Sequence, residues 1–160
     1  MQDHSGSAMI ALLPVTTDWC KIDLPHMTVV HAGEISELSP GDYSDLGKDV
    51  LDISREFAPV CLDVVGIDVF GGDGEDPVDV LVLEKTPEIL SMRSKVERWN
   101  ASQHDFNPHV TVGPVGSLDG RVPNKILFDR VHLGWGNRGM NAYLNPADAT
   151  TEMSVSAPSY

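Results

Sequence analysis

One five-residue pattern occurs twice in this chain, as PHMTV at residues 25–29 and as PHVTV at residues 108–112. The two histidines are 83 positions apart (109 − 26 = 83). Residues i and i+2 of a β-strand lie on one face, about 7 Å apart along the strand. Each copy therefore predicts a strand that buries an apolar face and presents a histidine and a threonine on the other. A chain with two such strands is expected to fold into two halves related by a pseudo-twofold axis.

The four polar motif residues are His26, Thr28, His109 and Thr111. If the halves are related by a twofold axis, the two His-Thr pairs converge across a cleft. A single His-x-Thr match arises easily by chance in a chain with six histidines. Two copies, both extended to Pro-His-x-Thr-Val and both on predicted strands, favour a function, although a duplication kept only for structure could also leave such a repeat.

Hydrophobic periodicity divides the chain into strands and two helices without a regular parallel βαβ series, so we predict an α+β fold. The helices begin at Ser39-Pro40 and Thr86-Pro87, where a hydroxyl caps and a proline follows. The predicted strands cover residues 8–13, 25–32, 60–70, 78–84, 106–113 and 125–135. We predict one bilobal domain over residues 1–144 and a flexible tail over residues 145–160, where periodicity is lost.

The net charge is −13, from 11 lysines and arginines against 24 aspartates and glutamates. A long nucleic acid partner needs a basic surface to displace phosphate counterions, so we do not expect one. A small phosphate-bearing ligand remains compatible with this charge, because a local site can differ from the whole. No apolar run approaches the roughly 20 residues that span a bilayer, and the first residues do not resemble a signal peptide. We expect a cytoplasmic protein, with Cys20 and Cys61 as thiols.

Two histidines facing one another suit a reaction in which one group removes a proton while another donates one. Cleavage of a phosphodiester by water is such a reaction. The nucleophile loses a proton on one side of phosphorus, and the leaving oxygen gains one on the other. Threonine hydroxyls can donate to the non-bridging oxygens, whose charge must be stabilised in the transition state. This chemistry requires neither a cofactor nor a metal.

The segments HMTV (26–29) and HVTV (109–112) resemble the two H-h-[T/S]-h signatures of the two-histidine (2H) phosphoesterase superfamily, where h is hydrophobic. That group contains the 2′-5′ RNA ligase-like proteins and the cyclic nucleotide phosphodiesterases. FNPHVTVG and VVGIDVFGG are similar to further parts of the family pattern, and the resemblance covers roughly residues 8 to 136. It implies two antiparallel sheets flanking a central cleft, with helices outside.

The resemblance also implies metal-independent cleavage or closure of 2′,3′-cyclic or 2′-5′ phosphodiesters in a small nucleotide or RNA end. His26 and His109 would then be the acid–base pair, and Thr28 and Thr111 the phosphate binders. The family usually has a helix between its first strand and the first motif, whereas VTTDWCKID (15–23) is too short for one. Trimmed versions of this kind resemble those of bacteriophages. A non-catalytic nucleotide-binding or phage assembly module and a 2′-5′ RNA ligase are the alternatives; the oligomeric state stays open.

Other residues have two interpretations each. Trp19 could stack on a nucleobase or pack in the first lobe, and Phe106 is expected in the core. Arg130 and His132 alternate with Val131 and Leu133, and they line the cleft or a solvated sheet face, depending on which face of that strand meets the motifs. We expect Arg138 in a turn.

Overall fold

In the computed structural model the described residues are 6–20, 22, 24–71, 76–102, 105–118, 122–135 and 138–145. The strands are β1 (Ser7–Pro14), β2 (Met27–Glu34), β3 (Val60–Phe70), β4 (Val78–Leu83), β5 (His109–Pro114), β6 (Lys125–Trp135) and β7 (Arg138–Tyr143). The helices are α1 (Pro40–Glu56) and α2 (Pro87–Val96), followed by a 3-10 turn, η3 (Glu97–Trp99); another, η2 (Ile35–Glu37), follows β2. The predicted order of elements is confirmed as far as β6, and β7 was not predicted. Of the predicted tail over residues 145–160, all but Asn145 lies outside the described residues.

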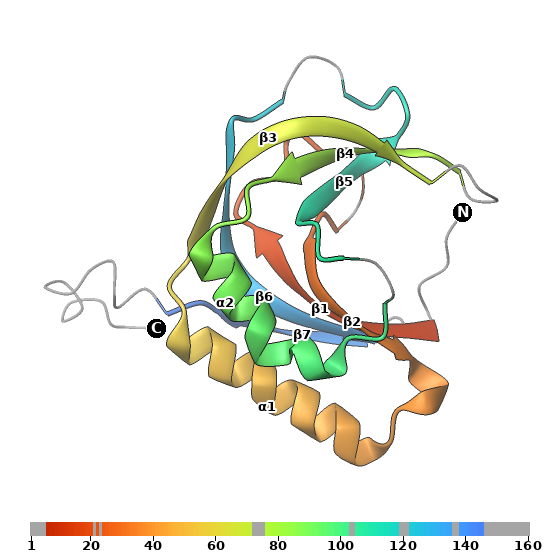
Figure 1. Cartoon of the computed structure of the whole chain (residues 1–160), viewed down its shortest axis with the longest axis vertical. Helices are drawn as coiled ribbons and strands as arrows, with labels where there is room; N and C mark the ends of the chain where they lie inside the picture. The colour runs from red at the N-terminus through yellow and green to blue at the C-terminus, as the bar shows by residue number, and fades with distance from the viewer. Residues whose placement is uncertain are drawn as a thin grey trace, which may run out of the picture.

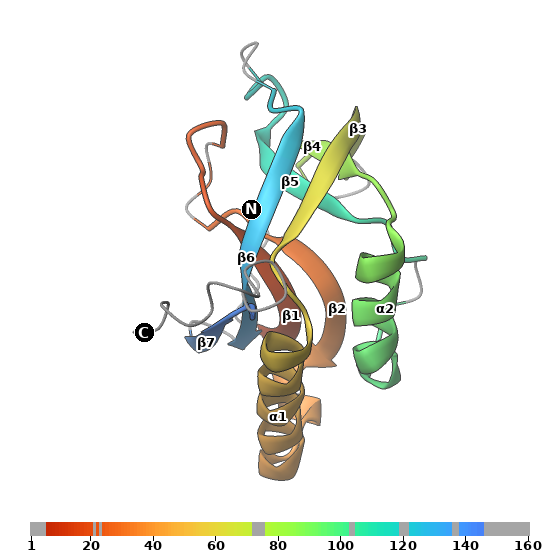
Figure 2. The same ribbon diagram turned by 90° about the vertical axis from the view of Figure 1, so that its left-hand side faces the viewer.

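The strands are joined in the order β1-β2-β5-β4-β3-β6-β7, with β1 also paired to β6, and every pair is antiparallel. Figures 1 and 2 show β3, β4 and β5 in the upper half and α1 at the bottom beside β1, β2 and β7, while β6 runs from the upper half down to β7. The two groups of strands meet where β2 touches β5 and where β3 touches β6. The predicted α+β class, with antiparallel sheets and helices outside, is confirmed.

Both helices begin where their capping residues predict. The Ser39 hydroxyl accepts a hydrogen bond from the Asp42 amide while the Asp42 carboxylate accepts one from the Ser39 amide, which forms a capping box. The Thr86 hydroxyl accepts from the Ile89 amide at 3.2 Å. The buried apolar residues of the helices close one core with the sheet; they are Leu46, Val50, Ile53, Ile89, Met92 and Val96.

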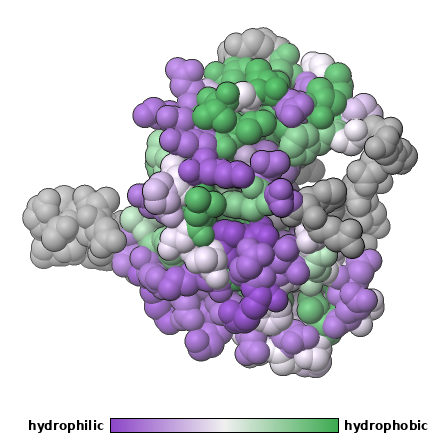
Figure 3. Space-filling view, in the orientation of Figure 1, coloured by the Kyte–Doolittle hydropathy of each residue, from purple (hydrophilic) through white to green (hydrophobic). Residues whose placement is uncertain are grey.

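The sheet has an exposed apolar end that the helices do not cover. In Figure 3 hydrophobic side chains gather over the upper strands, whereas the surface over the helices is hydrophilic. Val65, Ile67 and Val69 of β3 are 50–61% exposed. None of the described helices is long and apolar enough to span a membrane.

Two local predictions concern the segment between β1 and β2 and the segment that follows β6. Between Pro14 and Met27 the described residues form no helix, in agreement with the short spacing. The prediction that Arg138 lies in a turn is wrong, because it begins β7, which pairs with β6 from Trp135↔Arg138 to Arg130↔Tyr143. The segment RGMNAY has no clear apolar alternation, so its strand depends on that pairing.

Candidate functional site

The two motif strands touch at the centre of the repeated pattern. β2 pairs with β5 at Met27↔Val110. Extending this antiparallel register by one residue in each direction sets His26 opposite Thr111 and Thr28 opposite His109. A local twofold rotation about that pair therefore exchanges the two motifs. Residues directly opposite one another have Cβ atoms about 5 Å apart and diagonal neighbours about 7–8 Å, so the two histidines are diagonal neighbours on one face.

The same register can be followed across the sheet as three parallel rows of residues. The middle row passes through the core cluster and is made of Val131, Leu12, Met27, Val110 and Leu81. The row on one side, which we call the His26 row, contains Arg130, Leu13, His26, Thr111 and Val80. The row on the other side, the His109 row, contains His132, Ala11, Thr28, His109 and Val82. Side chains alternate between faces, so both motif rows lie on the face opposite the core.

On the motif face, buried apolar side chains lie beside the polar motif side chains. Ala11, Leu13 and Val80 are at most 2% exposed, yet they lie outside the main core cluster. The four motif side chains themselves are half-buried. The motif residues therefore stand beside buried apolar side chains while remaining accessible to a ligand.

Both histidine rings are held by the same hydrogen bond. His26 Nδ1 lies 2.8 Å from the Leu24 carbonyl oxygen, and His109 Nδ1 lies 2.7 Å from the Asn107 carbonyl oxygen. A carbonyl can only accept, so Nδ1–H donates in each case and the lone pair of the neutral ring is on Nε2. The backbone two residues upstream thus selects the same tautomer at both sites, an arrangement that prepares each Nε2 to exchange a proton.

The threonines have weak local partners. The Thr28 hydroxyl donates to the Met9 sulfur at 3.7 Å, and sulfur is a weak acceptor. The Thr111 carbonyl oxygen accepts a contact from the Cys20 sulfur at 3.6 Å. Exchanging the Thr28–sulfur bond for one to a charged oxygen is favourable, because hydrogen bonds to ionised groups are the stronger ones.

A cavity of about 520 Å³ opens beside Thr28 and His109. It lies along the part of β2 beyond its single pair with β5 and reaches the end of β3, where the Phe70 ring meets the His109 ring edge-on at 4.6 Å. The remaining lining residues are Val29, Val30, His31, Val69, Gly71, Arg93, Asn100, Ser102, Asp105, Phe106 and Asn107. Its size suits a small organic ligand.

Arg93 is a charged lining residue that the sequence interpretation missed. Its guanidinium donates to the Val29 carbonyl oxygen at 2.7 Å and to Glu97, and its Cζ lies 4.9 Å from the centre of the Phe106 ring. The hydrogen bond from Arg93, together with its charge, holds the pKa of the Glu97 carboxyl below its usual value of 4.5, although burial acts in the opposite direction. Arg93 follows Ile89 by four residues and so lies beside the buried stripe, which is the one sequence signal of its position.

The structure also shows where the residues with two interpretations lie. Arg130 and His132 lie on the motif face, each two strands from a motif histidine or threonine. The Arg130 guanidinium donates to Asp129 and to the Pro14 carbonyl, and His132 Nδ1 bonds the Asn141 side chain. Trp19 packs against the core, which favours its structural interpretation. Phe106 packs there too but also lines the cavity.

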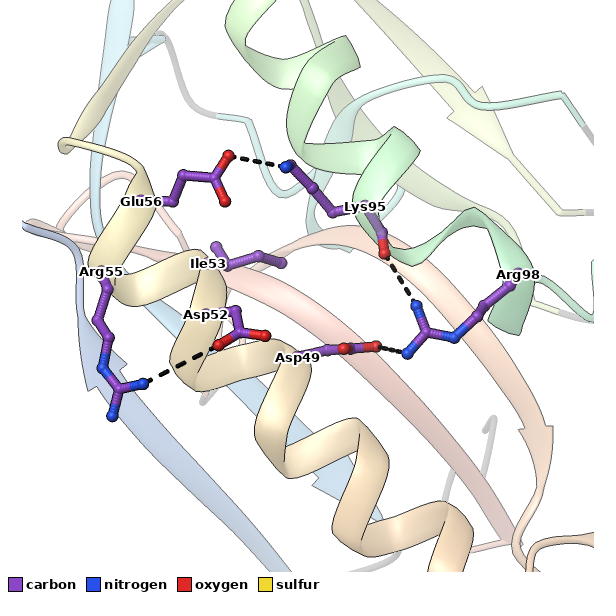
Figure 4. Close-up of a pocket in the computed structure, with 7 residues that line it drawn as sticks. All are labelled: Asp49, Asp52, Ile53, Arg55, Glu56, Lys95 and Arg98. Atoms are coloured by element: carbon purple, nitrogen blue, oxygen red, sulfur yellow. Dashed lines mark hydrogen bonds and ion pairs between the residues drawn. The ribbon is translucent and has the colours of Figure 1, made fainter.

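A second hollow, of about 470 Å³, lies between α1 and α2 and has a different character. Figure 4 shows its charged side chains paired with one another: Lys95 with Glu56, Arg55 with Asp52, and Arg98 with Asp49. Asp49 also accepts from the Trp99 indole N–H at 2.7 Å. The Lys95–Glu56 pair joins α2 to α1 and the Arg98–Asp49 pair joins η3 to α1, whereas Arg55 and Asp52 both belong to α1. The motif residues are not part of this hollow.

Comparison with solved structures confirms that the antiparallel strands and two helices match the fold of the two-histidine phosphoesterases. The chain is similar to TT0787 of Thermus thermophilus, at 15% identity and a TM-score of 0.56, over 87% of this chain and 95% of that one. It is also similar to Usb1 of Kluyveromyces marxianus, at 12% identity and a TM-score of 0.58, over 88% of this chain and 99% of that one. No family model matches the sequence, and no curated protein matches it.

Proposed function

We propose that the protein is a metal-independent phosphodiesterase that hydrolyses a cyclic or 2′-5′ phosphodiester in a small nucleotide or RNA end. The observation that carries this proposal is the register Met27↔Val110, which sets His26 and His109 diagonally on one face with a threonine opposite each. Their matching Nδ1 hydrogen bonds support an acid–base pair acting through the two Nε2 atoms. Likeness of fold to two-histidine phosphoesterases agrees with this chemistry.

In the reaction we assign, the scissile phosphoryl group binds between the two imidazoles. His109 Nε2 takes a proton from water as the water oxygen attacks phosphorus. His26, protonated on Nε2, gives its proton to the ribose oxygen as the P–O bond breaks. The products are a phosphomonoester and a hydroxyl, and the roles of the histidines reverse for the opposite direction. Thr28 and Thr111 donate to the non-bridging oxygens.

The cavity beside Thr28 and His109 supports a small ligand over a long nucleic acid. Its volume of about 520 Å³ is in the range of small-molecule sites, and the whole chain carries a net charge of −13. A nucleoside next to the scissile phosphate would occupy it. We therefore propose a small nucleotide or RNA end as substrate.

The test is hydrolysis without added metal and with EDTA present. The panel holds 2′,3′-cyclic nucleotides, 2′-5′ and 3′-5′ linked dinucleotides and cyclic oligonucleotides. His26→Asn and His109→Asn should each abolish turnover while the protein stays folded. His132→Asn is the matched control, because His132 belongs to the His109 row but is two strands from Thr28, and it should retain most of the activity. Full activity in folded His26→Asn and His109→Asn variants would refute the assignment.

Two other outcomes would point to the alternatives. Tight binding of a nucleotide without turnover of any panel member would favour a binding module. Joining of RNA halves with suitable ends, at a rate above hydrolysis, would favour a ligase acting through the same two histidines.

A further inference from the structure

The strands that carry the motifs separate immediately beyond the motifs. Within the described part of the chain, β2 and β5 share one paired position, Met27↔Val110. β2 continues to Glu34 without β5, and the segment that leads into β5 runs from Asp105 to Pro108. Beyond Met27↔Val110 there is thus a gap between β2 and the segment that leads into β5. Thr28 and His109 lie where this gap begins, so the distance between them depends on contacts that join its two sides.

Arg93 of α2 bridges the gap from the core side. Its Nη1 donates to the Val29 carbonyl oxygen at 2.7 Å, on the residue that follows Thr28. Its guanidinium carbon lies 4.9 Å from the centre of the Phe106 ring, three residues before His109. One planar group thus contacts the chain on both sides of the opening.

The Arg93 side chain is held rigidly enough for this role. It is only 12% exposed, and its Nε donates to the Glu97 carboxylate at 2.7 Å while Nη2 lies 3.4 Å from the other carboxylate oxygen. Such a two-point contact between guanidinium and carboxylate fixes the plane of the group. A lysine ammonium has neither the plane to lie on a phenyl ring nor the fork to bond Glu97 and Val29 together.

We propose that Arg93 is a positioning residue that sets the distance between Thr28 and His109 by tying β2 to the segment before β5. The proposal rests on the proposed phosphodiesterase function for its kinetic consequence. Without this tie the gap between the strands widens and the two motif side chains no longer meet the same phosphoryl group. A misplacement of about 1 Å can lower a catalysed rate by roughly 100-fold.

The experiment compares Arg93→Met, Arg93→Lys and Arg98→Met. Arg98 is a matched control because it also pairs with a carboxylate, Asp49, and lies over an aromatic ring, Trp99 at 5.2 Å, yet it joins η3 to α1. We expect Arg93→Met and Arg93→Lys to lower kcat by roughly 10- to 100-fold with a smaller change in KM. Arg98→Met should keep the kcat of the wild type.

Kinetics also separate positioning from direct binding of an anion. If Arg93 acted only as a positive charge for the substrate, Arg93→Lys would restore activity and Arg93→Met would chiefly raise KM. Either result would overturn the proposal.

Hydrogen exchange provides a readout that does not depend on turnover. Amides of residues 27–34 and 105–112 should exchange faster in both Arg93 variants, and at the wild-type rate in Arg98→Met. If the wild type hydrolyses no substrate, the proposed function fails. The exchange pattern still tests whether Arg93 holds β2 to the segment before β5. Unchanged exchange in Arg93→Lys, the variant that keeps the charge and most of the volume, would overturn it.

Discussion

Met27 of β2 and Val110 of β5 face one another at the position where the two motif strands join, and both are fully buried. Their side chains belong to the core, while the residues before and after them belong to the motif face. The pair therefore links the stability of the core to the alignment of the two His-Thr pairs. Any change that moves this pair moves both motifs.

Shortening Met27 should destabilise the protein. We expect Met27→Ala to lower the free energy of unfolding by about 2–5 kcal/mol, because it leaves a cavity in a close-packed core. Met27→Leu conserves volume and should cost less than about 1.5 kcal/mol. Denaturant unfolding monitored by circular dichroism measures both, and equal midpoints for the two variants would contradict the assigned core role.

The sequence predicted the motif face well because its evidence is local. Alternation over five residues is enough to place His26 with Thr28 and His109 with Thr111, and the repeat itself indicates that two strands meet. The register could not be predicted, since it depends on which residues of β2 and β5 pair. It is this pairing that sets His26 opposite Thr111 rather than opposite His109.

The features that were missed depend on contacts distant in sequence. Arg93 is one of two basic residues on α2, and its contacts with Val29 and Phe106 appear only once the helix is packed on the sheet. β7 has little apolar alternation and is held by its ladder with β6. Arg130 and His132 were placed on the correct strand, but the face that they share with the motifs follows from the ladder through β1.

Removing either threonine hydroxyl should slow catalysis without unfolding the protein. Thr28→Val and Thr111→Val keep the shape of the side chain but remove the donor. We expect each to lower kcat/KM by roughly 100-fold, the usual cost of losing one donor to a transition-state oxygen. The local twofold relation between the motifs predicts effects of similar size. Thr16→Val, in the loop after β1, is the control and should keep the kcat/KM of the wild type. A wild-type kcat/KM in both Thr28→Val and Thr111→Val would show that the threonines take no part in the mechanism.

The rate of hydrolysis should fall on both the acid and the alkaline side of its optimum. One imidazole must be neutral to accept a proton while the other must be protonated to donate one. If a variant with asparagine at His109 or His26 keeps residual activity, that activity should fall on only one side of the pH range, because one of the two proton-transferring groups is gone. The measurement is kcat/KM against pH for the wild type and each variant, and a profile that stays flat from acid to alkaline pH in the wild type would argue against two titrating histidines.

The ion pair of Arg93 with Glu97 should add stability that is lost in acid. Because Arg93 lowers the pKa of the Glu97 carboxyl, the folded state releases its proton more readily than the unfolded chain does. The stabilisation is therefore fully present above the unfolded pKa and disappears as the pH falls through the lower folded pKa. Glu97 is exposed, so the effect should be small. Unfolding of the wild type and Glu97→Gln at a series of pH values tests this: the difference should be constant well above pH 4.5 and shrink below it. A difference that grows on acidification would have the wrong sign.

Removing the cap of α2 should weaken that helix. The Thr86 hydroxyl accepts from the Ile89 amide, and Thr86→Ala removes this acceptor while leaving Pro87 in place. We expect the free energy of unfolding to fall by about 1 kcal/mol, within the usual range of roughly 0.5–2 kcal/mol for a lost cap. Thr86→Ser keeps the acceptor and should restore most of it. Because Arg93 lies on the second turn of the same helix, fraying of its first turn should raise amide exchange at residues 88–90 but leave exchange at residues 27–34 unchanged. Faster exchange at both places would show instead that α2 opens as one unit with the gap between β2 and β5.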